Sequence, residues 1–494
     1  MNGARVVLPA EERLLDAALA QLFAGRRRAA AVPVGKRPWL AAALVLLGVA
    51  VTAATMWLAR GPERDAAQEP APLPPPVRAD GRNAIEALPE GTQHLNAGIL
   101  SPDDARVFTR LRSLRRLAVR PLDVHVGPIN TRKKLPVWDD PPAAVFEPIA
   151  KLPALESLQI YGIATPPSVF ARLAGCATLR ELELTGEHVV VDDAFVQALA
   201  AIPALRSLRL DLVQLDAAAV ERLARLKLIS LHLSRPIGFD ADAWSRLCRW
   251  PTLETLSLHD LGRSFPWRGK DHVFFMPAPE DMQALGQLTK LRRLDLRACA
   301  FRDEHLAALP ESLQDLGLHS LELTPEGLRG LKRFGALRRL DVSTRRYNLR
   351  VFAREPVELR RECARAIADA IHALRLVALS FTGELTPELQ QAIVTQPELA
   401  ELEFPSLGVI ELDALAGLAE APALRRLRLV DASIPTRLST EVLAPLRRCR
   451  SLRRLELFVV DARGEPPFDD AAVRELLGPD VALHVQHEVW TVKK

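Results

Sequence analysis

Aromatic residues are scarce in this chain, where Phe, Trp and Tyr account for 5% of the 494 residues. Ring packing therefore cannot dominate the core, and aliphatic side chains must fill most of it. Hydrophobic residues still make up 48% and charged residues 26%, which is the balance of a folded protein. A chain of this length exceeds one ordinary globular core, so we expect several domains or an array of repeats.

The chain also lacks a large excess of charge of one sign. The formal net charge is +4, and Arg and Glu alternate along most segments. Proteins that bind nucleic acid concentrate basic residues on one face or in one stripe, and this sequence shows no such concentration. We therefore expect no nucleic-acid partner.

Cysteine is rare, with five residues far apart in the sequence: Cys176, Cys248, Cys299, Cys363 and Cys449. None belongs to a C-x-x-C pair and no His-rich tract accompanies them, so a zinc site is not expected. An odd number of scattered cysteines also argues against a disulfide framework. We expect five buried free thiols and no bound metal.

Sequence motifs of common catalytic sites do not occur in a context that would support catalysis. The sequence has no usable G-x-x-x-x-G-K-[ST], G-x-G-x-x-G, G-x-S-x-G or H-E-x-x-H pattern. We accordingly expect a protein that is not an enzyme and that needs no cofactor.

One long apolar run is present, at residues 39–58, with Trp39 and Trp57 at its ends. About 20 apolar residues at ~1.5 Å each match the ~30 Å hydrocarbon core of a bilayer, so we predict a transmembrane helix. Basic residues are more numerous before the run than after it, which places residues 1–38 in the cytoplasm and the rest outside. A cleaved signal peptide is the alternative, because residues 50–54 are small, but the long charged leader argues against cleavage.

Flanking segments complete this single-pass membrane arrangement. Residues 9–24 are predicted to form an amphipathic helix that docks a cytoplasmic partner, lies on the membrane or has no separate role. Residues 59–84 include Pro74, Pro75 and Pro76, and are predicted to form an extracytoplasmic stalk. Arg outnumbers Lys and Ala is abundant, which favours a bacterial source.

A repeated pattern organises residues 85–494. The segment from Leu291 to Phe301 reads L-x-x-L-x-L-x-x-C-x-F, and its middle leucine recurs in the preceding repeats at steps of 24, 26, 23 and 25 residues. Thirteen such segments are present, and each is predicted to form a strand whose fourth and sixth places point into the core. The recurring leucines are Leu158, Leu182, Leu208, Leu231 and Leu256.

Between these segments, apolar residues recur three to four apart, as in Phe195–Leu205, and predict a helix in each repeat. The chain from Ser101 to Leu457 thereby resembles the ribonuclease-inhibitor-like class of leucine-rich repeats. The resemblance implies an α/β leucine-rich repeat solenoid with a concave parallel β-sheet, convex helices and terminal caps. It departs from the family at the ninth place, where only Cys299 fits and Glu187, Val213, Leu261 and Ala432 do not. A last helix (468–477) and a last strand (481–492) are predicted to close the C-terminal end.

Three insertions, at 121–147, 262–280 and 343–364, interrupt the period after a strand and should leave the same rim of the solenoid. They hold much of the small aromatic content. Aromatic residues on loops are common anchors of protein interfaces, although such rings can also pin a long loop to its scaffold. The predicted partner-binding residues of the insertions are Trp138, Phe265, Trp267, Phe274, Phe275 and Tyr347.

A polar row is predicted on the concave sheet as a second candidate. The seventh places of four successive repeats hold His259, Arg297, His319 and Ser343, with Asp295 and Asp341 at fifth places. We count Asp295, Arg297 and His319 among the partner-binding residues. Metal binding or acid–base catalysis by this row is the less favoured alternative, because an open sheet supplies no closed pocket.

Together these patterns predict a membrane-anchored leucine-rich repeat protein that binds a partner protein outside the cytoplasm. An architectural scaffold of an envelope complex is the alternative from another class. An enzyme that uses the His and Asp row is the third.

Overall fold

The computed structural model describes residues 76–99, 105–121, 145–161, 167–185, 189–261, 264–267, 270–273, 275–297, 299, 301–319, 323–343, 357–405, 415–431, 440–461 and 470–489. The chain divides into two units, Met1–Leu73 and Pro74–Lys494, and the described residues belong to the second. The predicted cytoplasmic segment 1–38 and transmembrane helix 39–58 lie outside them. Within the described ranges, no helix combines the length and apolar character needed to cross a bilayer.

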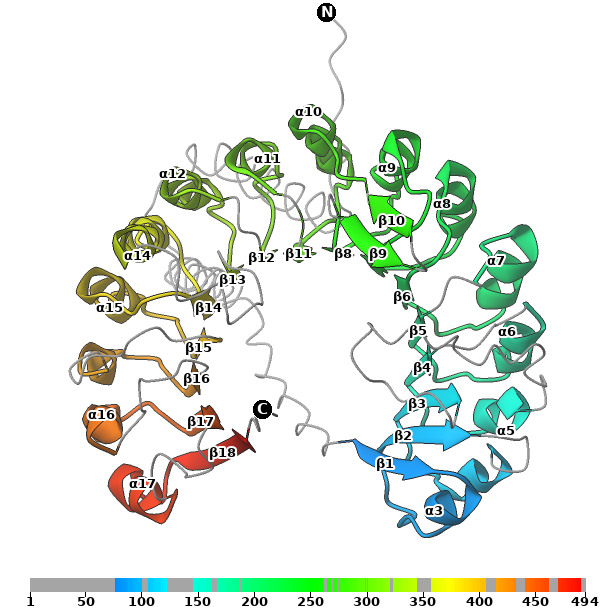
Figure 1. Ribbon diagram of the computed structural model, residues 1–494, viewed down its shortest axis with the longest axis horizontal. Coiled ribbons are helices and arrows are strands. Elements are labelled where there is room, and N and C mark those ends of the chain that lie inside the picture. The colour runs from blue at the N-terminus through cyan, green and yellow to red at the C-terminus, as the bar shows by residue number, and fades with distance from the viewer. Residues whose placement is uncertain are drawn as a thin grey trace, which may run out of the picture. The chain divides into compact units, whose positions relative to one another are not determined.

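One parallel sheet of 16 strands runs through the second unit, and its strands follow one another in chain order. The predicted parallel-strand α/β solenoid is thereby confirmed. Figure 1 shows the strands along the inner side of the arc and the helices along its outer side. The strands of this sheet are β1 (Val77–Asp80), β2 (His94–Ile99), β3 (Arg116–Pro121), β4 (Ser157–Tyr161), β5 (Glu181–Thr185), β6 (Ser207–Asp211), β7 (Ser230–Ser234), β8 (Thr255–His259), β11 (Arg293–Arg297), β12 (Asp315–His319), β13 (Arg339–Ser343), β14 (Ala378–Thr382), β15 (Glu401–Phe404), β16 (Arg426–Asp431), β17 (Arg454–Asp461) and β18 (Ala482–Val489).

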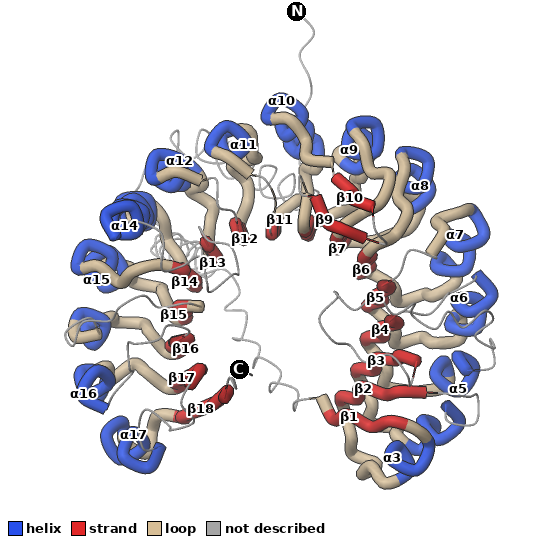
Figure 2. Tube along the Cα trace, in the orientation of Figure 1, coloured by secondary structure: helices blue, strands red, loops and turns tan. Residues whose placement is uncertain are grey.

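Short helices connect the strands and cover the outer side of the sheet (Figure 2). The α-helices are α3 (Arg82–Glu86), α5 (Phe146–Ala150), α6 (Pro167–Leu173), α7 (Asp193–Ala200), α8 (Ala217–Leu223), α9 (Ala241–Leu247), α10 (Pro279–Met282), α11 (Asp303–Ala307), α12 (Pro325–Arg329), α14 (Val357–Ile371), α15 (Pro387–Val394), α16 (Thr440–Leu443) and α17 (Asp470–Leu477). Single 3₁₀ turns extend or replace some of them at Val107–Arg110, Gln283–Gln287, Gly330–Arg333, Gly417–Glu420 and Ala444–Arg448.

The core lies between sheet and helices and is built from the leucines at the fourth and sixth places. Leu294 is aligned with Leu256 on one side and Leu316 on the other, and all three are completely buried. Because side chains alternate along a strand, this register sends the third, fifth and seventh places to the opposite, concave face. The helices complete the core with their own apolar sides, as Trp244 and Leu247 do in α9.

Aspartates before the helices set where several of them begin. The side chains of Asp192, Asp216 and Asp240 accept hydrogen bonds of 2.7, 2.7 and 2.8 Å from backbone N–H groups in the first turns of α7, α8 and α9. Such caps satisfy donors that have no partner inside the helix. The recurring Asp therefore fixes the point at which the chain changes from loop to helix in these three repeats.

The strand-to-loop turn has the same form in three successive repeats. Leu212, Arg235 and Asp260 directly follow β6, β7 and β8, and have positive φ angles of 57°, 48° and 60°. This left-handed backbone conformation is unfavourable for residues other than glycine. Each of these residues still donates its backbone N–H to the next repeat, at 3.0, 3.2 and 2.9 Å. The lateral hydrogen bonds offset the local strain.

The ninth place of the repeat is filled in two ways. The Cys299 thiol donates to the backbone carbonyl of Leu258 in the preceding repeat, at 3.4 Å. Val213 and Leu261 are instead buried in the core. Apolar packing thus replaces the polar bracing that the family pattern would supply.

The sheet begins earlier than predicted. Residues 77–80 were expected to belong to an extended stalk, but they form β1, which pairs with β2. The stalk prediction, which ran to residue 84, is wrong for residues 77–84, because β1 and the start of α3 belong to the fold. Ala79 is buried, and Asp80 forms an ion pair with the buried Arg120 of β3. At the other end, α17 and β18 agree with the predicted closing helix and strand.

All five cysteines are buried and free, as predicted. Burial raises the pKa of the Cys248 thiol to about 12, and it also raises that of Cys176. These thiols are therefore protonated at neutral pH and act as small core residues.

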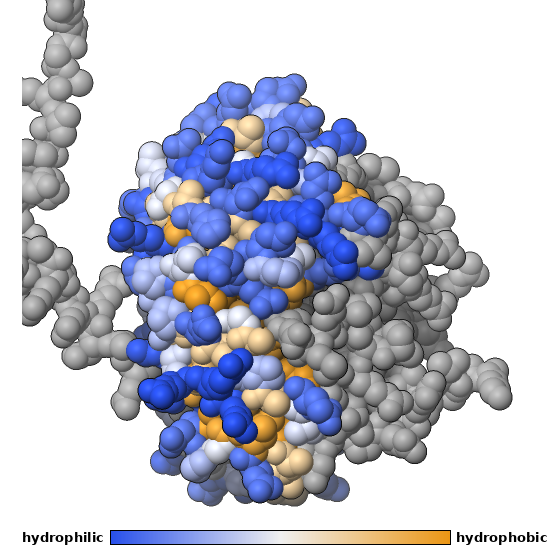
Figure 3. All heavy atoms as spheres, turned by 90° about the vertical axis from the view of Figure 1, so that its left-hand side faces the viewer, coloured by the Kyte–Doolittle hydropathy of each residue, from blue (hydrophilic) through white to orange (hydrophobic). Residues whose placement is uncertain are grey.

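The outer surface over α12, α14 and α15 is largely hydrophilic (Figure 3). Ion pairs connect successive helices there, including Arg329 with Asp369 at 3.4 Å and Arg365 with Glu388 at 3.0 Å. The more buried pair, Arg360 with Glu384 at 2.8 Å, ties α14 to the loop before α15. This polar surface suits contact with water.

Replacing Leu294 by Ala should cost about 2–5 kcal/mol of stability, because it leaves a cavity between β11 and the helices. Urea unfolding of the purified protein would measure the loss. Arg292→Ala is the control, because that side chain is exposed beside the same strand, and it should change stability by less than about 0.5 kcal/mol. Equal effects of the two substitutions would contradict the core assignment.

Candidate functional site

The candidate site is the concave face, which consists of the side chains at the third, fifth and seventh places of the strands. Neighbouring strands lie ~4.8 Å apart, so residues at one place form a continuous row. The predicted row at the seventh place is present: Arg297 is aligned with His259 and with His319, and His319 is aligned with Ser343.

Asp295 is the centre of charge on this part of the face. It accepts hydrogen bonds from Arg297 Nε at 2.9 and 3.1 Å, and its Oδ2 lies 3.8 Å from His259 Nε2. Burial alone would raise the pKa of Asp295, but His259 and Arg297 outweigh burial and lower the pKa to about 2. Asp295 is therefore ionised throughout the physiological range.

Gly317 makes room for this carboxylate in the next strand. A Cβ at Gly317 would lie 2.6 Å from Asp295 Oδ1, a distance that real Cβ contacts do not show. Beyond Gly317, Asp341 accepts a hydrogen bond from His319 Nε2 at 3.0 Å, with the tautomer assigned from this contact. The two acidic residues predicted for the fifth place thus sit in separate contacts, one on each side of a glycine.

His232 belongs to the same face, although the sequence analysis did not include it. Its ring meets that of His259 edge-on, with centroids 4.1 Å apart and planes at 78°. Burial, together with the neighbouring His259, lowers the pKa of His232 to about 3, so this imidazole stays neutral. Its place in the repeat, the fifth of β7, could have identified it, since the row of fifth places runs from His232 towards Asp295.

Three polar atoms of this region are buried without a hydrogen-bond partner among the described residues: His259 Nε2, His319 Nδ1 and Asp341 Oδ1. Buried polar atoms are normally hydrogen-bonded, so these three atoms are exceptions. They do not form a metal site, because Arg297 stands between His259 and His319 in the register. The described ranges contain no group of three His, Cys, Asp or Glu side chains arranged to hold a metal ion.

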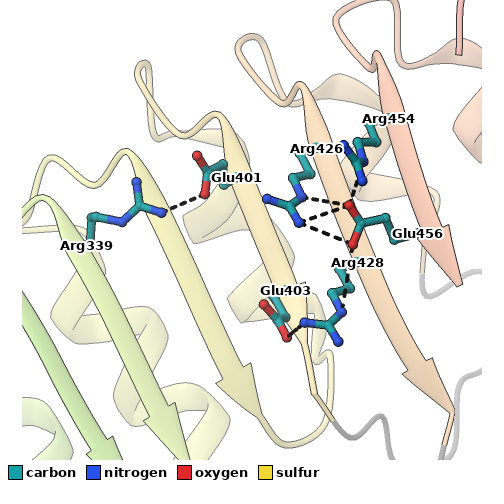
Figure 4. A network of polar contacts seen from close by, with 7 residues as sticks. All are labelled: Arg339, Glu401, Glu403, Arg426, Arg428, Arg454 and Glu456. Carbon is teal, nitrogen blue, oxygen red and sulfur yellow. Dashed lines mark hydrogen bonds and ion pairs between the residues drawn. The ribbon is translucent and has the colours of Figure 1, made fainter. Parts of the chain in front are cut away.

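A second polar network lies on the concave face of β13–β17 and was not predicted (Figure 4). Glu456 accepts from Arg426 at 3.0 and 3.2 Å, and lies 2.6 Å from Arg454 and 3.9 Å from Arg428. Arg428 also donates to Glu403 at 2.9 Å. The arginines outweigh the effect of burial and lower the pKa of Glu456. Arg and Glu at successive third and fifth places were the signal available in the sequence.

A hollow of about 210 Å³ opens next to this network, over β14. It exists because β14 has small side chains, Ala378 and Ser380, at its third and fifth places on the concave face. The strands on either side carry larger charged residues at the same places. Arg339 and Asp341 line the hollow from β13, and Glu401 and Glu403 line it from β15.

The insertion at 262–280 forms a β-hairpin, β9 (Ser264–Trp267) and β10 (Lys270–Val273), where a loop was expected. Trp267 is paired with Lys270 and Phe265 with His272. Residues opposite one another in an antiparallel pair share one face, so this register gives the hairpin one face with two aromatic positions. The side chains of Phe265 and Trp267 lie outside the described residues, as do Trp138, Phe274 and Tyr347 entirely.

Two aromatic residues of the insertions contact the scaffold. Phe275 packs against the core, and its ring lies 6.2 Å from that of Phe239. Phe146 is completely buried in α5. These two rings have the geometry of pins that hold an insertion to the solenoid, which was the alternative to the interface role.

The low pKa of His232 predicts a specific loss of stability in acid. Its ordinary pKa is 6.5 and its folded pKa is about 3, so between these values the unfolded chain binds a proton that the folded chain does not. The contribution is complete above pH 6.5 and falls as pH drops, by ~1.4 kcal/mol per unit, or about 2 kcal/mol by about pH 5. The urea midpoint of wild type should therefore fall relative to that of His232→Gln as pH drops below 6.5. His484→Gln, at an exposed fifth place in β18, should run parallel to wild type. Parallel curves for His232→Gln would contradict the assignment.

Comparison with known proteins returned no matching family model and no matching curated protein. Solved structures do show similarity. The yeast Rad7 and Elc1 complex includes a chain that is 17% identical, with a TM-score of 0.38 over 78% of this chain and 88% of that one. An internalin from Listeria monocytogenes is 13% identical, with a TM-score of 0.30 over the same shares. At these values the similarities say nothing about what this chain binds, and the fold assignment rests on its own sheet and register.

Proposed function

We propose that the second unit is a protein-recognition module, a leucine-rich repeat domain of the ribonuclease-inhibitor-like class that binds a partner protein on its concave face and rim. The observation that carries this proposal is the concave face itself, where charged side chains are held by ion pairs. Asp295 and Arg297 pair within β11, Arg339 and Glu401 pair across β14, and Arg426 and Arg428 pair with glutamates of the strands next to β16. Side chains fixed in this way lose little further freedom on binding, which favours association. Arginine, which recurs here, is also enriched in protein interfaces.

The hairpin supports a contribution from the rim. It follows β8 and carries Phe265 and Trp267, and aromatic residues on a projecting element are frequent binding anchors. Phe275 is not counted among these anchors because it packs against the core. The proposed partner-binding residues are therefore Trp267 and Phe265 of the hairpin, Trp138, Phe274 and Tyr347 of the insertions, and Asp295, Arg297 and His319 on the concave face.

The scaffold alternative would need a second large apolar surface. The exposed large apolar residues of the described ranges are isolated in sequence, at Val77, Val190, Ile229 and Leu359. Scattered apolar residues are normal on a soluble surface and do not define an interface. We therefore favour recognition over scaffolding.

We further propose that residues 39–58 anchor the protein in a cell membrane, with residues 1–38 in the cytoplasm and the repeat domain outside. The apolar length of this run and the basic residues before it support this orientation.

A reporter that is active only outside the cytoplasm should be active when fused after Lys494, because the basic flank holds the N-terminus inside. The same reporter fused before residue 39 is the control and should be silent. Activity of the control alone would reverse the orientation, and a mature protein that begins near Ala54 would show cleavage in place of an anchor.

Trp267→Ala should weaken partner binding by about 2 kcal/mol, or ~30-fold, if this residue is an anchor on the rim. The partner would be identified by proximity labelling around the repeat domain, and its affinity then measured with purified proteins. Stability should stay within about 0.5 kcal/mol of wild type if the ring is an anchor, because substitutions on a surface element away from the core change stability little. Leu359→Ala, which removes an exposed apolar side chain from α14, should change neither property.

Two outcomes would redirect this assignment. Unfolding caused by Trp267→Ala would make the ring a pin, as Phe275 is. Unchanged binding by Trp267→Ala, together with lost binding by Asp295→Asn, would confine the site to the concave sheet.

A further inference from the structure

Around the hollow over β14, one row of residues forms an ion pair across the strand and the next row does not. At the third place, Arg339 of β13, Ala378 of β14 and Glu401 of β15 are aligned, and Arg339 reaches across the small Ala378 to donate to Glu401 at 2.7 Å. The two outer strands lie ~9.6 Å apart, so a single arginine side chain spans β14 and closes this end of the hollow.

At the fifth place, the same geometry lacks its cation. Asp341, Ser380 and Glu403 are aligned across β13, β14 and β15, so that two carboxylates face each other over the small Ser380. The neighbouring row has an arginine paired with a glutamate. This row has two carboxylates, and no cationic side chain lies between them among the described residues.

The charges around the hollow leave Asp341 poorly compensated. Four carboxylates and three arginines line it, and within the described part of the chain three of these carboxylates, Asp315, Glu401 and Glu403, have an arginine partner. Among the described residues, Asp341 pairs with His319 and with no arginine, and 33% of its side chain is exposed.

Glu403 responds to the same imbalance. Burial raises its pKa, and the nearby Asp341 raises it further, although Arg428 acts in the opposite direction. A cation placed between Asp341 and Glu403 would relieve the repulsion between them.

We propose that the hollow over β14 receives an arginine side chain of a protein partner, whose guanidinium group lies over Ser380 and bridges Asp341 and Glu403. Arginine fits better than lysine, because a planar guanidinium presents five N–H donors and can serve two carboxylates at once. The inference rests on the proposed recognition function and names the chemistry that the concave face selects.

The test uses the full-length protein and a blocked pentapeptide, acetyl-Gly-Ser-Arg-Ser-Gly-amide, with citrulline in place of Arg as the neutral probe. Wild type should bind the arginine peptide saturably and the citrulline peptide at least about tenfold more weakly, since charge-assisted hydrogen bonds are lost. Asp341→Asn and Glu403→Gln should each weaken the arginine peptide by about tenfold. Glu183→Gln is the matched control, because Glu183 occupies the fifth place of β5, far along the sheet from the hollow.

A filled hollow gives an independent variant. Ser380→Arg places a guanidinium group between the same two acids from within the chain, so it should abolish peptide binding and leave the thermal midpoint unchanged or higher. This variant separates occupation of the hollow from damage to the fold, which Asp341→Asn alone could cause through His319.

Equal binding of the two peptides by wild type, or no binding of either, would overturn the proposal, as would undiminished binding of the arginine peptide by Ser380→Arg. These results do not depend on the recognition function. If Trp267→Ala reduces capture of the natural partner while Ser380→Arg and Glu403→Gln do not, recognition stands and the arginine pocket falls. If no partner is captured but the peptide results hold, the pocket stands and the wider function falls.

Discussion

The alignment of leucines at the fourth and sixth places is the constraint on which the rest of this structure depends. Leu256, Leu294 and Leu316 stack in one register, and a shift of a single residue would send every buried side chain of a strand to the concave face. Such a shift would bury Asp295 and Arg297 in the core, where the loss of hydration is too costly. The core therefore determines which residues can form the site.

That register also forces charged residues into close rows, because neighbouring strands lie only ~4.8 Å apart. Like charges in adjacent strands would repel, and the chain avoids this in two ways. Arg426, Arg428 and Arg454 share the single carboxylate of Glu456, and Gly317 separates Asp295 from Asp341. Salt screens partly buried ion pairs such as these less than it screens fully exposed pairs.

The sequence was sufficient for the solenoid and for one row of its concave face, because both follow from periodicity. The places of His259, Arg297 and His319 in the repeat gave their alignment directly. Residues 77–80 were missed because the short segment VRAD lacks the leucine pattern, and it is held by the distant Arg120. The hairpin β9–β10 was missed because its pairing is set by a turn and not by the repeat. The hollow over β14 exists because Ala378 and Ser380 are small. The repeat pattern is defined by its large apolar residues, so it does not predict where small residues on the concave face leave space.

Near balance of charge determines how such a face can discriminate between partners. Several of its carboxylates are already paired with an arginine, as Glu401 is with Arg339 across β14. A partner that offers only bulk positive or negative charge must break these pairs, and each broken pair leaves a partly buried charge uncompensated. Net binding energy is available mainly where the chain leaves a charge without a strong partner. If the face recognises a partner as proposed, specificity would come from the positions of carboxylates without an arginine partner, such as Asp341, more than from total charge.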